Sequence, residues 1–378
     1  TSAGTYRTTD DGLTWQPLEG VLSSGGVAEF LFGGTSGSVV AATGYGLFSS
    51  QDSGALWSPL GEGLPANSKI AGLLSHPARP DLLYAVSDNR AAWTAAAPPV
   101  IWRSLDEGRR WQPAAAGLPD VPLTAWAIDP LNPDRLVVAS WDYVAVSADG
   151  GLSWQTNRLE SSNRQAIAIA AADPQTVYLG GRPALRSTDG GRTWQPVAVR
   201  MAGEAEQPAD VTGLAVDPAD ARHLWASLAT GVYESRDGGE TWQPHGLDGQ
   251  PVRWLALAVQ EVQDETQAPD YALYAGVADG GLQRWAPDTA SWQPAQAGLP
   301  AGSTLTALAA DPVTAGLLWA ARDGGGVYRS EDGGATWTPV GTGVGDNLGQ
   351  ALAINHAEPE SVFLGTAAAG VWVRSANM

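Results

Sequence analysis

The segment Ser187-Thr188-Asp189-Gly190-Gly191-Arg192-Thr193-Trp194 decides the fold, because copies of it return along the whole chain about every 45 residues. In each copy the aspartate can accept hydrogen bonds from backbone N–H groups two residues on, glycine supplies positive φ, and Thr-Trp suits the start of a strand. Each copy therefore predicts a tight turn between two β-strands. The other copies are Thr8–Trp15, Ser50–Trp57, Ser104–Trp111, Ser147–Trp154, Ser235–Trp242, Ser330–Trp337 and Trp285–Trp292, which has lost the serine and the glycine.

A second motif keeps the same period upstream of the first. Apolar runs flank an Asp-Pro pair, which initiates turns and so predicts a hairpin between two buried strands. One unit then has four antiparallel strands, which is the pattern of a propeller blade. The pairs are Asp129-Pro130, Asp173-Pro174, Asp217-Pro218 and Asp311-Pro312.

We therefore predict an all-β chain that forms a single β-propeller domain over residues 1–378, with eight four-stranded blades. The N-terminal segment 1–18 lacks a first strand pair, and the C-terminal segment stops where a box would begin. We expect Trp15-Gln16-Pro17-Leu18 to close the last blade as its outer strand. Tyr6-Arg7-Thr8 and Trp372-Val373-Arg374 compete for the third place in that blade, and we expect the C-terminal copy to take it. The predicted blades are 19–60, 61–114, 115–157, 158–197, 198–246, 247–296, 297–341 and 342–378.

Composition excludes several classes of function. The net charge of −19 disfavours nucleic-acid binding. Without cysteine there is no disulfide, thiolate nucleophile or cysteine-ligated zinc, and the four histidines show no metal spacing, so we expect neither a metal nor another cofactor. No apolar run is long enough to span a membrane. We expect the mature form of an exported chain, placed outside the cell, in the periplasm or on the cell surface.

The repeated motifs are Asp boxes, and the chain resembles the Asp-box (BNR) β-propellers along its whole length. The trailing Gly63-Leu64-Pro65, Gly117-Leu118-Pro119 and Gly298-Leu299-Pro300 make it look most like the branch of sortilin-type receptor domains, xyloglucanases and the photosystem II assembly factor. The resemblance implies a propeller fold. It does not fix an activity, because this fold serves several functions.

We interpret the boxes as scaffold. Spread one per blade around a rim, their carboxylates would lie too far apart for the pair, roughly 5 to 10 Å apart, that glycoside hydrolysis needs. Eight of the 17 tryptophans are box residues, which accounts for much of the tryptophan excess. The structural residues are Asp10, Asp52, Asp106, Asp149, Asp189, Asp237 and Asp332, with Trp15, Trp57, Trp111, Trp154, Trp194, Trp242, Trp292 and Trp337.

Binding is expected on the opposite face, where the loops from second to third strands surround the channel. Trp93, in the long loop 87–100, is a platform for a sugar ring or peptide, or else folds back over its blade. Arg90, Arg182 and Arg322 invite comparison with the carboxylate clamp of sialidases, in which Tyr45 or Tyr143 would be the nucleophile and Asp142, Asp279 or Asp323 the acid. No Arg-Ile-Pro motif is present, however, and we assign no catalytic residue. The candidate binding residues are Tyr45, Arg90, Trp93, Asp142, Tyr143, Arg182, Asp279, Arg322 and Asp323.

The acidic insertion 260–270 has no calcium-loop spacing and is interpreted as a solvated loop. Our first hypothesis is a non-catalytic interaction or scaffold propeller that binds a protein or a polysaccharide through the channel face. The alternative is a glycoside hydrolase or a lectin-like glycan-binding propeller that uses the same face. Two carboxylates or three arginines converging in one pocket at the mouth of the channel would favour that alternative.

Overall fold

The structure is a computed structural model of the 378-residue chain. It describes residues 5–8, 16–18, 27–32, 39–43, 46–50, 58–60, 63, 70–76, 79–87, 101–106, 110–119, 121–159, 166–197, 210–260, 271–278, 281–300, 305–310, 314–322, 327–340, 349–354, 362–366 and 370–374. These residues are almost entirely strands and turns, with one short 3-10 helix, η2 (Pro287–Thr289).

The strands of the described residues form eight sheets, seven of them four-stranded and antiparallel. The first four-stranded sheets are β3 (Val27–Phe32), β4 (Val39–Thr43), β5 (Gly46–Ser50) and β6 (Ser58–Leu60); β7 (Ile70–His76), β8 (Arg79–Ser87), β9 (Ile101–Ser104) and β10 (Gln112–Pro113); and β11 (Ala125–Ile128), β12 (Leu136–Ala139), β13 (Tyr143–Ser147) and β14 (Gln155–Arg158). The next are β15 (Ile167–Ile169), β16 (Val177–Leu179), β17 (Leu185–Ser187) and β18 (Gln195–Pro196); and β19 (Gly213–Val216), β20 (Leu224–Leu228), β21 (Gly231–Ser235) and β22 (Gln243–Pro244). The last are β23 (Val252–Val259), β24 (Tyr271–Val277), β25 (Gly281–Ala286) and β26 (Ser291–Pro294); and β27 (Leu305–Ala310), β28 (Leu318–Arg322), β29 (Val327–Ser330) and β30 (Thr338–Pro339).

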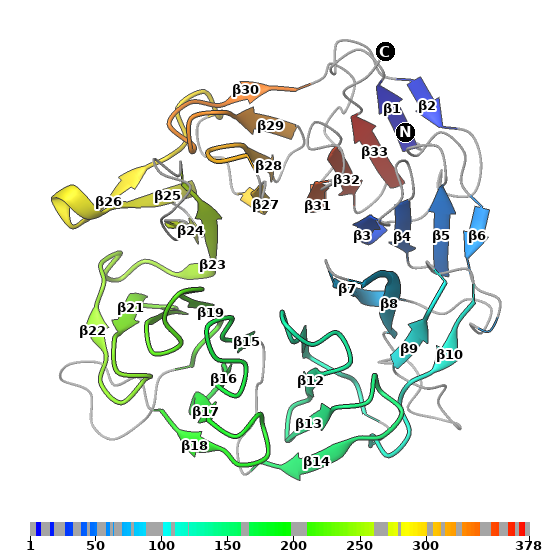
Figure 1. The fold of residues 1–378 in the computed structure, drawn as a ribbon. Coiled ribbons are helices and arrows are strands. Elements are labelled where there is room, and N and C mark those ends of the chain that lie inside the picture. Colours follow the sequence, from blue (N-terminus) through cyan, green and yellow to red (C-terminus); the bar gives the residue numbers. More distant parts are fainter. Residues whose placement is uncertain are drawn as a thin grey trace.

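The sheets are arranged around a common centre, with first strands such as β3, β19 and β27 innermost and the last strand of each sheet outermost (Figure 1). The eighth sheet joins the two ends of the chain. It contains β31 (Gly349–Ile354), β32 (Val362–Thr366), β33 (Gly370–Arg374), β1 (Thr5–Thr8) and β2 (Gln16–Leu18).

The C-terminal copy takes the third place in this sheet as predicted, but the premise that the two terminal strands exclude each other was wrong. The C-terminal β33 takes the third place beside β32, and β1 pairs with it in parallel, Tyr6 opposite Trp372. The N-terminal β2 then pairs antiparallel with β1 as a fifth strand. The free edge of β33 offers unpaired backbone groups, and β1 satisfies them.

The core lies between neighbouring sheets. One cluster joins Leu82 and Tyr84 of β8 to Leu136 and Val138 of β12. Equivalent clusters fill the spaces between later sheets, including the space between the β19–β22 and β23–β26 sheets. The second strands are almost wholly buried because they face a neighbouring sheet on both sides.

The Asp box is a closed set of short hydrogen bonds. Ser187 Oγ donates to Asp189 Oδ1 at 2.7 Å and accepts the N–H of Gly191 at 2.7 Å. The carboxylate of Asp189 then accepts the N–H and the hydroxyl of Thr193 at 2.9 and 2.6 Å. The expected bonds from two residues on were wrong here, because two left-handed glycines carry the chain around the carboxylate before Thr193 returns. The N–H two residues on is used instead in the Asp-Pro turn, where Leu131 donates to Asp129.

The box tryptophans anchor the sheets in two ways. The indole Nε1 of Trp154 donates to the carbonyl of Ala114 in the preceding sheet at 2.8 Å, and Trp337 does the same to Ala295. The indoles of Trp194 and Trp242 instead bond glycine carbonyls of their own boxes, Gly191 and Gly239, and are only half-buried. The boxes of Asp106, Asp149, Asp237 and Asp332 show the same serine-to-aspartate bond, whereas Asp10, Asp52, Trp15 and Trp57 lie outside the described residues.

Candidate functional site

The channel-face residues that we expected to bind a partner are only partly described. Tyr45, Arg90, Trp93, Asp279 and Asp323 lie outside the described residues.

The four described members of that set have different surroundings. Asp142 is exposed and lies 3.4 Å from Arg158. Tyr143 is only 4% exposed and packs in the core, where burial raises the pKa of its phenol well above the ordinary range, so its burial favours a packing role. Arg182 is exposed and lies between β16 and β17, whereas Arg322 is half-buried at the end of β28. These strands lie on different sides of the centre (Figure 1).

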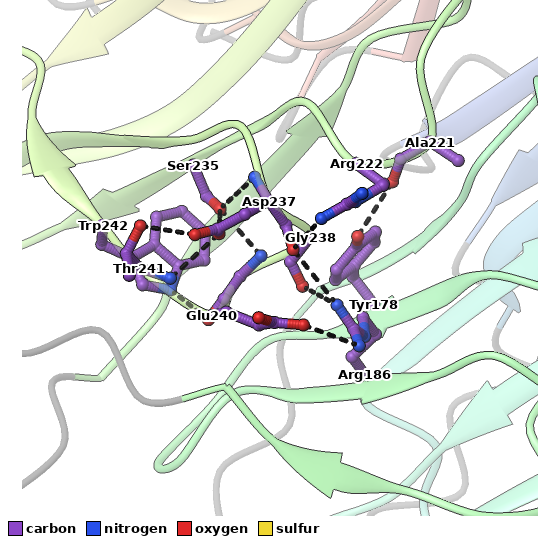
Figure 2. A network of polar contacts seen from close by, with 11 residues as sticks. Tyr178, Arg186, Ala221, Arg222, Ser235, Asp237, Gly238, Glu240, Thr241 and Trp242 are labelled. Carbon is purple, nitrogen blue, oxygen red and sulfur yellow. Dashed lines mark hydrogen bonds and ion pairs between the residues drawn. The ribbon is translucent and has the colours of Figure 1, made fainter.

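The face opposite the channel face carries a repeated contact between neighbouring sheets, which we call the junction latch. In the β15–β18 sheet, Tyr178 and Arg186 stand opposite each other on adjacent strands. The hydroxyl of Tyr178 donates to Ala221 O at 2.8 Å, and Arg186 Nη1 donates to Gly238 O at 2.7 Å, both in the next sheet (Figure 2). This face contains both the Asp-Pro turns and the Asp boxes, because Gly238 N–H bonds Arg222 O within one sheet at 2.9 Å.

The same pair of residue types recurs at other junctions. Tyr84 of β8 donates to Pro133 O, and its strand partner Arg103 donates to Gly150 O at 3.2 Å. Tyr274 of β24 stands opposite Arg284 and donates to Gly333 O at 2.8 Å. The residue before the box serine, or at its equivalent, is arginine in β9, β17, β25 and β29.

The β19–β22 sheet breaks this pattern. Its strand partners at the latch positions are Trp225 and Glu234, so a carboxylate stands where β9, β17, β25 and β29 place a guanidinium. The box of the following sheet is the degenerate one, with η2 in place of the Asp-Gly-Gly turn. Both halves of the latch are therefore changed at the same junction.

A pocket of ≈ 520 Å³ opens at this junction, and we call it the latch pocket. Trp225, Trp285 and Tyr271 supply its aromatic surface, and Glu234 and Asp217 supply its carboxylates. The neighbouring junctions also carry grooves, of ≈ 560 and ≈ 480 Å³, but those are lined by the latch arginines Arg186 and Arg284.

Two histidines connect the carboxylates of the latch pocket. His223 Nδ1 lies 2.9 Å from Asp217 Oδ2 and its Nε2 lies 2.7 Å from Glu234 Oε1. His245 Nδ1 lies 3.3 Å from Glu234 Oε2, and its ring packs against Trp285 with centroids 3.8 Å apart and the planes tilted by 33°. Arg236 reaches Glu234 Oε1 from the rim at 2.6 Å.

These contacts set the charges of the pocket. Burial alone would lower the pKa of His223, but hydrogen bonds to Glu234 and Asp217 outweigh it and raise that pKa. Burial would raise the pKa of Glu234, but the bonds from His223 and His245 and the nearby charge of Arg236 lower it strongly. Glu234 is therefore an anion at neutral pH. In the described part of the chain, no group of three or more His, Asp or Glu side chains is arranged to hold a metal ion.

Sequence reasoning assigned His223 and His245 no role and did not single out Glu234. The available signal was the glutamate in Glu234-Ser235, where the equivalent residue of the sharpest other copies is arginine. The strand pairing that places Trp225 opposite Glu234 is visible only in the structure, so the sequence alone offered no reason to connect this glutamate with the two histidines.

Comparison with known proteins supports the repeat assignment. The BNR/Asp-box repeat model matches residues 185–196 and 233–244. A relative described as a probable oligoxyloglucan-reducing end-specific xyloglucanase, from Neosartorya fischeri, is 26% identical over 72% of this chain and 41% of its own length. The chain thus spans about two fifths of that relative.

Solved structures are similar in fold. A structure described as YCF48 bound to D1 peptide aligns with a TM-score of 0.51 and 15% identity, covering 100% of this chain and 98% of that one. YCF48 from Cyanidioschyzon merolae aligns with a TM-score of 0.50 and 16% identity over 93% of this chain and 95% of that one. In the part of the chain that is described, no helix has the length and apolar character to cross a bilayer.

The repeated boxes, the antiparallel sheets around a common centre and these similar proteins agree: the chain carries BNR/Asp-box repeats on a propeller-like fold, and it is similar to a xyloglucanase in sequence and to YCF48 in fold.

Proposed function

We propose that residues 1–378 form one eight-bladed propeller, closed by its terminal strands, that acts as a non-catalytic binding scaffold outside the cytoplasm. Its partner is a protein segment or a polysaccharide held on the channel face. Among the residues that we assign to that face, the described ones that are at least partly exposed are Asp142, Arg182 and Arg322.

The state of the described carboxyl groups carries the non-catalytic part of the proposal. Glycoside hydrolysis needs one carboxyl group that stays protonated beside another that is ionised. In the latch pocket, Asp217 and Glu234 are both paired with His223, and Glu234 also with Arg236. Where the pKa of a described carboxyl group departs from its ordinary value, the departure is downward, as at Asp81, Asp149, Asp189, Glu234, Asp237 and Asp332. None of these groups has the raised pKa of a general acid.

The relatives support both classes of partner. One relative is described as a probable oligoxyloglucan-reducing end-specific xyloglucanase, and one similar structure is described as YCF48 bound to D1 peptide. The relative at 26% identity also favours the alternative, a glycoside-directed enzyme or lectin, and the same experiment addresses it.

The test combines retention with hydrolysis. Purified chain is run by affinity electrophoresis in gels with and without xyloglucan, titrated with peptides covering the exported proteins of its source, and assayed for new reducing ends. Retention or peptide binding without hydrolysis supports the scaffold, and new reducing ends overturn it. Arg182→Ala combined with Arg322→Ala should weaken binding, whereas Arg192→Ala, an exposed arginine of an Asp box on the other face, should leave it unchanged.

A further inference from the structure

We propose that the latch pocket between the β19–β22 and β23–β26 sheets is a second binding site, which takes the guanidinium group of an arginine side chain presented by a polypeptide partner. This site lies on the Asp-box face and does not depend on the channel-face proposal.

The repeat itself indicates the chemistry of the ligand. At the preceding junction the same place is filled from within: the guanidinium of Arg186 lies beside Tyr178, donates to the carbonyl of Gly238 and lies 3.7 Å from Glu240 (Figure 2). At the latch pocket the internal guanidinium is replaced by the carboxylate of Glu234, and an aromatic residue, Trp225, keeps the tyrosine position. The position has lost its own cation and gained an anion.

The lining of the pocket suits such a group. Trp285 and Tyr271 are half-buried, so part of each side chain is accessible, and both line the pocket. Guanidinium groups stack on aromatic faces and form bidentate hydrogen bonds with carboxylates. An ammonium group lacks this planar fork and interacts as a point charge. The −19 net charge of the chain also attracts a cationic ligand.

Two buried nitrogens of the pocket lack partners among the described residues. They are Nε1 of Trp225, which is 8% exposed, and Nε2 of His245, which is 9% exposed. In a neutral imidazole whose Nδ1 donates to Glu234, the Nε2 of His245 is an acceptor. Buried polar atoms are normally paired, so these two groups point to a ligand that brings donors, such as guanidinium N–H groups, and an acceptor, such as a peptide carbonyl.

The rim contact of Arg236 shows that Glu234 accepts a guanidinium that approaches from solvent. Arg236 Nη2 lies 2.6 Å from Glu234 Oε1, while 72% of the arginine side chain remains exposed. Only the arginine side of this ion pair is exposed to solvent, so an incoming arginine can compete with Arg236 for Glu234. Arg236 is then a competitor of the ligand rather than a part of the site.

The experiment uses the full chain and isothermal titration with a short Gly-Arg-Gly peptide, its citrulline analogue and a xyloglucan oligosaccharide. Citrulline keeps the shape and removes the charge, so it should bind at least about tenfold more weakly, as expected when a charged hydrogen bond is lost. Glu234→Gln should weaken binding of the arginine peptide by a similar factor, and Arg236→Ala should strengthen it. Glu240→Gln, which removes an exposed carboxylate at the neighbouring groove, is the matched control and should bind as the parent does.

Because Glu234→Gln should weaken binding and Arg236→Ala should strengthen it, the two variants together distinguish an effect on the site from a loss of folding. A general loss of structure could weaken binding in Glu234→Gln, but it could not strengthen binding in Arg236→Ala, and thermal melts of both variants give the direct check. Equal affinity for arginine and citrulline, no binding of either peptide, or unchanged binding in both variants would overturn the proposal. Binding of the oligosaccharide in place of the peptide, with loss in Glu234→Gln, would overturn it in favour of a sugar site.

Discussion

Arg186 and Gly238 are 52 residues apart in sequence, yet Arg186 Nη1 lies 2.7 Å from the carbonyl oxygen of Gly238 and fastens one sheet to the next. A glycine suits this place for two reasons. Its φ is +79°, and a Cβ on its backbone would lie 2.3 Å from the same guanidinium nitrogen. The Asp-box glycine therefore completes a turn and also makes room for the arginine that connects two sheets.

Removing this latch should destabilise the protein. Arg186→Ala leaves the Gly238 carbonyl without its charged donor, and hydrogen bonds to charged groups contribute about 1.5–3 kcal/mol. We expect a loss of that size in the free energy of unfolding measured with urea. Arg192→Ala, an exposed arginine of the preceding box, is the control and should change stability by less than about 0.5 kcal/mol. Equal melting of the two variants would contradict the latch.

The two anchoring modes of the box tryptophans predict different costs. Trp154→Ala removes a buried ring and its bond to Ala114 in the preceding sheet, so we expect a loss of about 3–5 kcal/mol. Trp194→Ala removes a half-buried ring whose indole bonds Gly191 of its own box, and it should cost clearly less. Urea denaturation of both variants measures the difference, and the reverse order would refute the assignment of Trp154 as the stronger anchor.

The Asp boxes should make the protein acid-sensitive. Hydrogen bonds from Ser153, opposed by burial, lower the pKa of Asp149 to about 2. A carboxylate whose pKa is lower in the folded state stabilises the protein above its ordinary pKa near 3.9, and that contribution is lost as the pH falls through the folded value of about 2. Asp149→Asn should therefore be less stable than the parent at neutral pH, with the difference shrinking between about pH 4 and 2. Asp248→Asn, at an exposed position, is the control in the same denaturant series, and a gap that stays constant with pH would argue against this mechanism.

Removing one partner of the buried ion pair between Asp129 and Arg135 should strongly destabilise the protein. Arg135 Nη1 lies 2.6 Å from Asp129 Oδ2, both side chains are more than nine-tenths buried, and the arginine also donates to Pro174 O in the next sheet. Asp129→Ala leaves a buried, unpaired guanidinium and should cost about 3–5 kcal/mol. Calorimetric melting checks this, with Asp81→Ala, which breaks the exposed pair with Arg79, as the comparison.

His223 should give stability a pH dependence of opposite sign. Its pKa is raised in the folded state by the bonds to Glu234 and Asp217, against burial. The bridge therefore stabilises the protein fully below the ordinary histidine pKa of about 6.5, and this contribution is lost as the pH rises through the raised value. Asp217, Glu234, Arg236 and His245 are the charged or titratable groups that face the ring in the described structure. His223→Gln should flatten the melting temperature against pH in this range, and an unchanged slope would exclude the bridge as its source.

Much of the local structure could be predicted from the sequence because it depends on near neighbours. The Asp boxes, the Asp-Pro turns and the four-strand period all follow from residue types within about ten positions, whose turn chemistry does not need the rest of the fold. The strand-pairing error at the termini had the opposite origin. Whether Tyr6 and Trp372 exclude each other or lie side by side depends on a free sheet edge, and no local pattern records that edge.

The sequence by itself determined the repeated turns and the tryptophans that pack beside them, since each is built from a short contiguous motif. Only the tertiary structure decided which residues meet between sheets. Glu234 occupies the repeat position that Arg186 occupies one sheet earlier. This substitution forms a pocket only because Trp225 of β20 lies opposite Glu234 and the next sheet places Trp285 beside them. Contacts across a junction join residues about one repeat apart, and their distances are set by how the sheets pack, which the sequence period does not specify.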